Sequence, residues 1–186
     1  MGGWRRVPPQ LIDGNGDKIM GDHAPASLEE SIGNKRLFLL VVDASDELRA
    51  AVRFACRRAL HTNGAVALFY AVEPSEFHHF ATIAELMEEE AHTEAQRLLQ
   101  TVAADVHNLT GAFPSLHMRE GDTTEQLLQV LLEEPDISVL VLGASASGEG
   151  PGPLVSALSD KLAGKINVPV TVVPGGLSNE EIDTLT

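Results

Sequence analysis

Four continuous apolar runs divide the chain, and polar or mixed segments separate them. The runs cover residues 36–43, 65–74, 137–143 and 169–175, with sequences such as RLFLLVVD and ISVLVLG. Strands that are apolar without alternation are buried on both faces, which is typical of a parallel sheet. The pattern also predicts a short strand at residues 114–119. We therefore expect five parallel strands.

The segments between these runs carry apolar residues at helical spacing. After the first run, five residues share one face of a helix: Leu48, Ala51, Val52, Ala55 and Ala59. Ser45 can cap this helix, and Asp122 can cap another that ends before Pro135. Two more helices are predicted, over about 82–107 and 153–166. The alternation of strands and helices predicts an α/β fold, an open five-stranded parallel sheet with helices on both faces.

The composition divides the chain into three parts. Residues 1–34 are rich in Pro, Gly, Asp and Asn and lack periodicity, so we interpret them as an N-terminal extension, partly disordered or laid over the domain surface. Residues 35–175 form the predicted domain. Residues 176–186 are interpreted as an acidic C-terminal tail.

Charge and hydropathy exclude several classes of partner. The formal net charge of −14 opposes binding to nucleic acids and to anionic membranes. No apolar run reaches the length of a transmembrane helix, and the first residues lack the apolar stretch of a signal peptide. We expect a cytoplasmic protein. Cys56 is the only cysteine, so an internal disulfide is excluded.

No motif for catalysis or metal binding is present. The serines have no adjacent histidine to activate them, and there is no phosphate-loop lysine, so we expect no enzymatic activity. His78, His79, Glu88 and His92 are candidate metal ligands, but they lack the HExxH spacing. A solvated helix face is the favoured interpretation, and we predict no metal.

Four stretches carry a resemblance to a known family: LLVVDASDELRAAVRFA, LFYAVEP, REGDTTEQLLQVLLEE and VLVLGA…PVTVVPG. In this order and spacing they resemble the universal stress protein domain, from about Lys35 to Pro174. The resemblance implies a homodimer built by pairing of the last strands. Val170, Val172 and Val173 would then lie at or near the interface.

The resemblance also implies a test for ATP binding. Binding members carry a glycine, two residues, a second glycine, nine residues, and then Gly-Ser or Gly-Thr. Gly143 fits the first glycine, but Ala146, Ser156 and Ala157 occupy the other key positions. Ser145 and Gly148 lie in the same loop, where further glycines restore flexibility.

The nucleoside side of the family's site maps to strand ends. Asp43 corresponds to the acid that contacts ribose or adenine, and it can equally be a strand-end acid bonded to local backbone. Val41, Ala71 and Leu142 would line the adenine pocket, although each is also an ordinary core residue. Three functions remain: a non-enzymatic dimeric stress-response module acting through an unidentified protein partner, a sensor of ATP with Mg²⁺, or a sensor of a less charged ligand.

Overall fold

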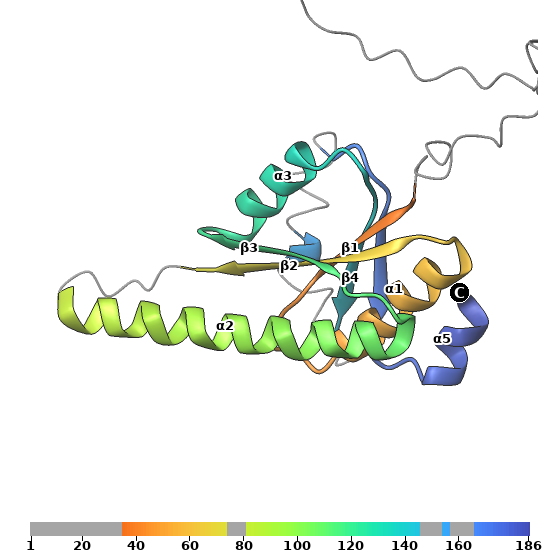
Figure 1. Cartoon of the computed structure of the whole chain (residues 1–186), viewed down its shortest axis with the longest axis horizontal. Helices are drawn as coiled ribbons and strands as arrows, with labels where there is room; N and C mark the ends of the chain where they lie inside the picture. Colours follow the sequence, from red (N-terminus) through yellow and green to blue (C-terminus); the bar gives the residue numbers. More distant parts are fainter. Residues whose placement is uncertain (1–34, 74–80, 146–153, 157–165) are drawn as a thin grey trace, which may run out of the picture. The chain divides into compact units, whose positions relative to one another are not determined.

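The sheet has five strands, all parallel, in the order β3-β2-β1-β4-β5 (Figure 1). The structure is a computed structural model that describes residues 35–73, 81–145, 154–156 and 166–186. In chain order, the strands are β1 Leu37–Val41, β2 Ala65–Val72, β3 Ser115–Glu120, β4 Ile137–Ala144 and β5 Val170–Pro174. The predicted parallel sheet is confirmed.

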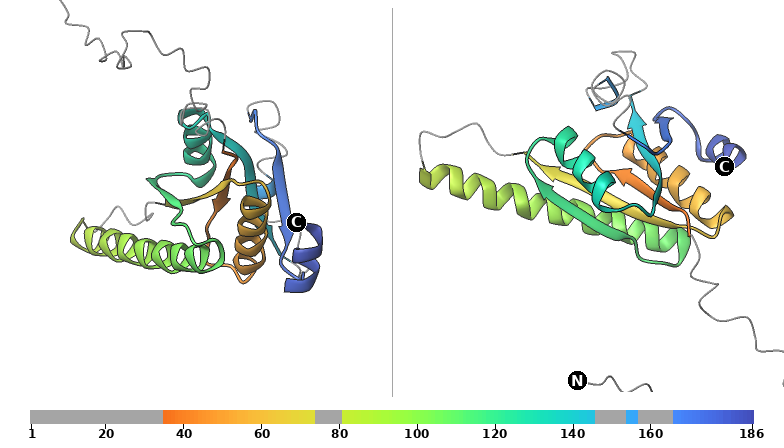
Figure 2. Two further views of the ribbon diagram at one scale, coloured as in Figure 1. Left: turned by 45° about the vertical axis from the view of Figure 1, so that its right-hand side comes forward. Right: turned by 90° about the horizontal axis from the view of Figure 1, so that it is seen from above.

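Helices cover both faces of this sheet, as the sequence predicts. The helices are α1 Leu48–His61, α2 Ala81–Thr110, α3 Thr123–Glu133 and α5 Asn179–Leu185. Figures 1 and 2 show α1 and α2 on one face and α3 on the other. Of the helix predicted at 153–166, residues 154–156 are helical and 157–165 lie outside the described residues. The predicted extension, residues 1–34, lies outside them too.

Alternate residues of β1 build two separate cores. Phe38 and Leu40 pack with residues of α1 and α2, whereas Leu39 and Val41 pack with residues of α3. Successive side chains of a strand point to opposite faces, so a strand between two helical layers must be apolar at every position. This requirement explains the uninterrupted run LFLLV.

The chain leaves β1 in one direction and returns on its other side. It adds β2 and β3 outward, and β4 then pairs with the free edge of β1 before β5 completes the sheet. Open α/β sheets bind ligands outside the carboxyl ends of strands near such a reversal. The topology therefore predicts a ligand site at the carboxyl ends of β1, β2 and β4.

The two predicted caps have different outcomes. The Asp122 side chain accepts a hydrogen bond from the Glu125 backbone N–H at 2.9 Å, which confirms it as the cap of α3. The prediction for Ser45 is wrong, because α1 is preceded by Glu47 without a side-chain cap. The Ser45 hydroxyl instead donates to the Asp43 carboxylate at 2.5 Å. A hydrogen bond to a charged carboxylate is stronger than one between neutral groups, so the Ser45 hydroxyl bonds to Asp43 and does not cap the helix.

Residues 176–186, predicted as an acidic tail, contain the helix α5. The Ser178 side chain accepts from the Glu181 N–H at 3.2 Å, and the Glu181 carboxylate accepts from the Ser178 N–H at 2.8 Å. This reciprocal capping box lowers the pKa of Glu181 below its usual value, mainly through the backbone hydrogen bond from Ser178. Ile182 is fully buried in the core beside α1.

Candidate functional site

A cleft of about 700 Å³ opens at the carboxyl ends of β1 and β2. Its lining comes from both strand ends, the start of α3, the middle of α2 and the helical residues 154–156. The lining residues are Val41, Val42, Asp43, Tyr70, Ala71, Val72, Glu73, Ala91, Glu94, Asp122, Thr123, Thr124 and Leu154. The cleft lies where the topology predicts a ligand site.

Three of the residues proposed from the sequence meet in this cleft: Val41, Asp43 and Ala71. Parallel strands end at the same edge of the sheet, so residues at the ends of β1 and β2 come together although they are far apart in sequence. Val41 is largely buried, whereas Asp43 is exposed at the rim. The two apolar residues and the acid thus form one wall with a polar edge.

The proposed residues near β4 occupy other positions. Leu142 is buried in the α3-side core, and Gly143 packs against the start of α1, where an added Cβ would lie 3.3 Å from the Glu47 Cβ atom. Ser145 is exposed after β4. None of these residues, nor Ser156, is among the residues that line the cleft. Ala146, Gly148 and Ala157 lie outside the described residues.

The cleft contains six polar or aromatic residues that the sequence analysis did not select: Tyr70, Glu73, Glu94, Asp122, Thr123 and Thr124. Glu73 is an acid that directly follows β2, as Asp43 comes shortly after β1, and this is a signal that could have identified it. Asp122 was found as a cap, and a cap at this sheet edge necessarily faces the strand ends. Glu94 carries no such signal, because only tertiary packing fixes which turn of α2 faces the cleft.

Asp43 is held by its own loop. Its Oδ1 atom accepts from the Ser45 backbone N–H at 3.1 Å and from the Ser45 hydroxyl at 2.5 Å. This arrangement fixes the direction of the carboxylate while the residue remains exposed to solvent. The side chain is therefore a positioned acceptor at the mouth of the cleft.

The cleft is acidic along its rim. Four carboxylates line it, from Asp43, Glu73, Glu94 and Asp122, and no lysine or arginine is among its described lining residues. The Thr123 hydroxyl donates to Glu73 Oε1 at 2.8 Å, a hydrogen bond that brings no positive charge to the cleft. Within the described part of the chain, Glu94 alone of the four has a cationic partner, Arg97, whose hydrogen bonds hold the pKa of Glu94 below its usual value.

The N-terminus of α3 faces the same cleft but is already capped. Backbone N–H groups at a helix start attract anions. Here the Asp122 carboxylate occupies that position through its bond to the Glu125 N–H. A ligand anion would have to displace or approach a carboxylate, so the helix start offers little attraction to a phosphate.

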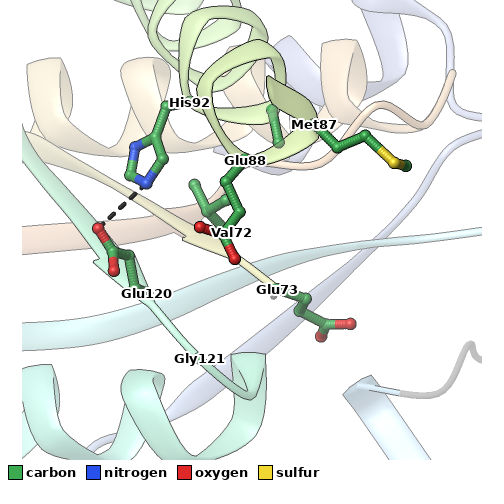
Figure 3. A pocket seen from close by; sticks show the side chains of 8 residues that line it. Val72, Glu73, Met87, Glu88, His92, Glu120 and Gly121 are labelled. Carbon is green, nitrogen blue, oxygen red and sulfur yellow. Dashed lines mark ion pairs between the residues drawn. The ribbon is translucent and has the colours of Figure 1, made fainter. Parts of the chain in front are cut away.

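A second cavity of about 360 Å³ adjoins the cleft and shares Val72, Glu73 and Ala91 with it. Figure 3 shows His92 on α2 pointing toward Glu120 at the end of β3, with 3.0 Å between Nε2 and Oε1. His92 therefore joins α2 to the sheet edge. The described residues contain no group of three His, Cys, Asp or Glu side chains arranged to hold a metal ion. His78 and His79 lie outside these residues.

Comparisons with known proteins agree on one family. The sequence model described as "Universal stress protein family" matches residues 36–174. No curated protein sequence matches the chain. In the part of the chain that the structure describes, no helix is both long and apolar enough to cross a membrane.

Solved structures share the fold at low sequence identity. Universal stress protein UspA from Lactobacillus plantarum has a TM-score of 0.64 and 19% identity, covering 75% of this chain and 98% of that one. A universal stress protein from Archaeoglobus fulgidus gives 0.60 and 17%, covering 79% and 99%. Another structure from that organism, a complex with dAMP, gives 0.53 and 17%, covering 75% and 97%.

The cap of α3 allows a direct test of how the cleft edge is held. Asp122→Ala should lower the free energy of unfolding by about 1 kcal/mol, because the Glu125 N–H loses its acceptor. Asp122→Asn keeps an acceptor oxygen and should stay within about 0.5 kcal/mol of the wild type. Urea denaturation measures both. An equal loss in the two variants would mean that the negative charge, and not the hydrogen bond, stabilises this edge.

Proposed function

The chain belongs to the universal stress protein family, and we propose that it is a non-enzymatic regulatory module whose cleft binds a nucleoside-like ligand of low negative charge. One observation carries the proposal: the cleft at the strand ends has apolar walls and four rim carboxylates without a lysine or arginine among its described lining residues. The module acts as a cytoplasmic homodimer through protein partners.

The charges decide between a nucleoside and a triphosphate. Two unit charges about 6 Å apart interact by roughly 3 kcal/mol at an effective dielectric constant of about 20. A neutral hydrogen bond contributes only about 1 kcal/mol. The repulsion between several carboxylates and a triphosphate is therefore larger than the free energy that a few hydrogen bonds contribute to binding. Mg²⁺ would offset part of this repulsion, so ATP with Mg²⁺ serves as the competing ligand in the test below.

The apolar wall suits a planar base. Val41 and Ala71 present small aliphatic side chains, and Tyr70 lies beside them along the cleft. The related fold from Archaeoglobus fulgidus was solved with dAMP, which supports an adenine nucleoside as the shape to test. Asp43, as a fixed acceptor at the rim, is positioned to accept a hydrogen bond from a hydroxyl or an amino group.

Titration calorimetry with adenosine and with Mg-ATP tests this proposal. Adenosine should bind more tightly than Mg-ATP, and Ala71→Leu should weaken adenosine by about tenfold or more because the added atoms occupy the cleft. Ala104→Leu is a matched control on the exposed side of α2 and should bind like the wild type. Tighter binding of Mg-ATP supports the ATP-sensor alternative. If neither ligand gives a binding signal up to millimolar concentration, the ligand-binding proposal is rejected.

Asp43→Asn separates the two ligands further. The amide keeps an acceptor oxygen for the Ser45 contacts but removes one negative charge from the rim. Adenosine affinity should fall by roughly tenfold, because a hydrogen bond to a charged acceptor is worth more than one to a neutral acceptor. Mg-ATP affinity should rise in the same calorimetric series. Unchanged values for both ligands would remove Asp43 from the proposed site.

The dimer has its own test at the edge strand β5. Val170 and Val172 are 41% and 39% exposed, whereas Val173 is buried in the core of its own chain. Val172→Glu would bring two like charges together in a two-fold interface and should yield the mass of one chain in light scattering. Leu132→Glu, at an exposed position on α3, should leave the dimer intact. A folded Val172→Glu variant that stays dimeric rejects β5 as the interface.

A further inference from the structure

Basic residues are unevenly distributed in this acidic chain. Of its 13 lysines and arginines, four lie in α1: Arg49, Arg53, Arg57 and Arg58. We call Arg53, Arg57 and Arg58 the basic face of α1, because all three contact the segment that contains α5. A concentration of positive charge in a protein of net charge −14 is a local exception that attracts carboxylates.

The basic face holds α5 by charge and by one apolar anchor. Arg53 donates through Nε to Asp183 Oδ1 at 2.9 Å and through Nη2 to Asp183 Oδ2 at 2.6 Å. Arg58 Nη1 donates to the backbone oxygen of Thr186 at 3.1 Å. Ile182 has no exposed surface and belongs to the core cluster on the α1 side. Figures 1 and 2 show α5 lying beside α1.

The charge state of Asp183 is maintained by this contact. The hydrogen bonds from Arg53 hold the pKa of Asp183 below its usual value, and Arg57 acts in the same direction. An arginine fork recognises a carboxylate specifically, so this surface selects an acidic side chain next to an apolar one.

The fit of α5 to this surface is incomplete. The Arg57 Nε atom is buried and lacks a hydrogen-bond partner within the described residues. It lies 3.2 Å from Asp183 Oδ1, which makes an ion pair without hydrogen-bond geometry. An unsatisfied buried donor lowers the stability of the docked state, and a segment with a second acceptor at this point would bind better.

The helix α5 cannot be stable without α1. It spans only seven residues, Asn179–Leu185, which is far below the length at which isolated helices form in water. Its large apolar residue Leu185 is 62% exposed, so Ile182 alone anchors it in the core. It also lies beyond residues 36–174, the part that matches the family. Helix α5 is thus a short addition to the domain that depends on the basic face.

We propose that the basic face of α1 is a docking site for an acidic amphipathic helical segment of a partner protein, and that α5 occupies this site until a partner displaces it. The resident helix defines the chemistry of the partner. The segment has a branched apolar residue followed directly by a carboxylate, with further acids in the preceding turn. The inference concerns the protein partner and is independent of any ligand in the cleft.

A labelled peptide of residues 178–186, SNEEIDTLT, serves as the probe. Fluorescence anisotropy compares its binding to the full wild-type chain and to the full-length double variant Ile182→Gln/Asp183→Asn, in which α5 is released. The variant should bind the peptide at least tenfold more tightly than the wild type. The full-length variant Leu132→Gln/Asp136→Asn also changes an aliphatic residue to glutamine and an aspartate to asparagine, at exposed positions around the end of α3. It should bind like the wild type.

Three further measurements keep the result interpretable. Arg53→Gln, added to the released variant, should abolish peptide binding, and a peptide with Asp183→Lys should not bind. If Ile182→Gln prevents folding, Asp183→Asn alone replaces the double variant. In the wild type, excess peptide should also increase amide hydrogen exchange at residues 179–185.

Three outcomes overturn the proposal. The first is a folded, released variant that fails to bind the peptide at millimolar concentration. The second is equal binding of the Asp183→Lys peptide, which would make the contact non-specific. The third is a released variant whose binding is confined to its own copies in light scattering, which would assign the surface to exchange of α5 between chains. Titration of the same variants with adenosine measures ligand binding in the cleft independently of peptide binding to α1.

Discussion

Burial of β1 on both faces is the constraint on which the other features depend. A central strand with no solvent-exposed face needs helices on both sides of the sheet. Its backbone N–H and C=O groups must also be paired, and β2 and β4 pair with them on its two edges. The strand can therefore meet solvent only at its ends. The carboxyl end is where the chain turns outward to α1, and Asp43 is the first side chain after β1 to be exposed. The cleft is a consequence of this burial.

The distribution of charge then separates two kinds of surface. Carboxylates collect around the cleft, where the described lining contains no basic side chain. Arginines collect on α1, where Asp183 and the backbone oxygen of Thr186 meet them. The two surfaces lie on different elements, and each is suited to a different class of molecule. A small ligand of low negative charge fits the first, and an acidic protein segment fits the second.

The features that could be predicted from the sequence are those that depend on hydrophobic periodicity and on the positions of strand ends. The five strands were predicted from the apolar and polar pattern. Val41, Asp43 and Ala71 were implied by the family resemblance, and the parallel sheet places them in one cleft because its strands end at one edge. Glu94 could not be predicted, because the packing of α2 on the sheet decides which of its turns faces the cleft. The helix α5 was missed although Ser178 and Glu181 match a capping box. With Ile182 as its only buried residue, its pattern is too short to distinguish from a tail, and its stability comes from α1.

Gly143 illustrates why a motif position is not the same as a binding role. An added Cβ at Gly143 would crowd Glu47, and one at Gly175 would lie 3.0 Å from the Glu47 Cα atom. The Gly175 N–H donates to the carbonyl of Ala144, so the ends of β4 and β5 are held together beneath the start of α1. A Cβ at Gly175 would require Glu47 to shift, and one at Gly143 would make a tight contact with it. The glycine that fits the family's ATP pattern therefore also has a packing role beside Glu47. What distinguishes ligands in this chain is the charge around the cleft, whose described lining residues include four carboxylates and no lysine or arginine.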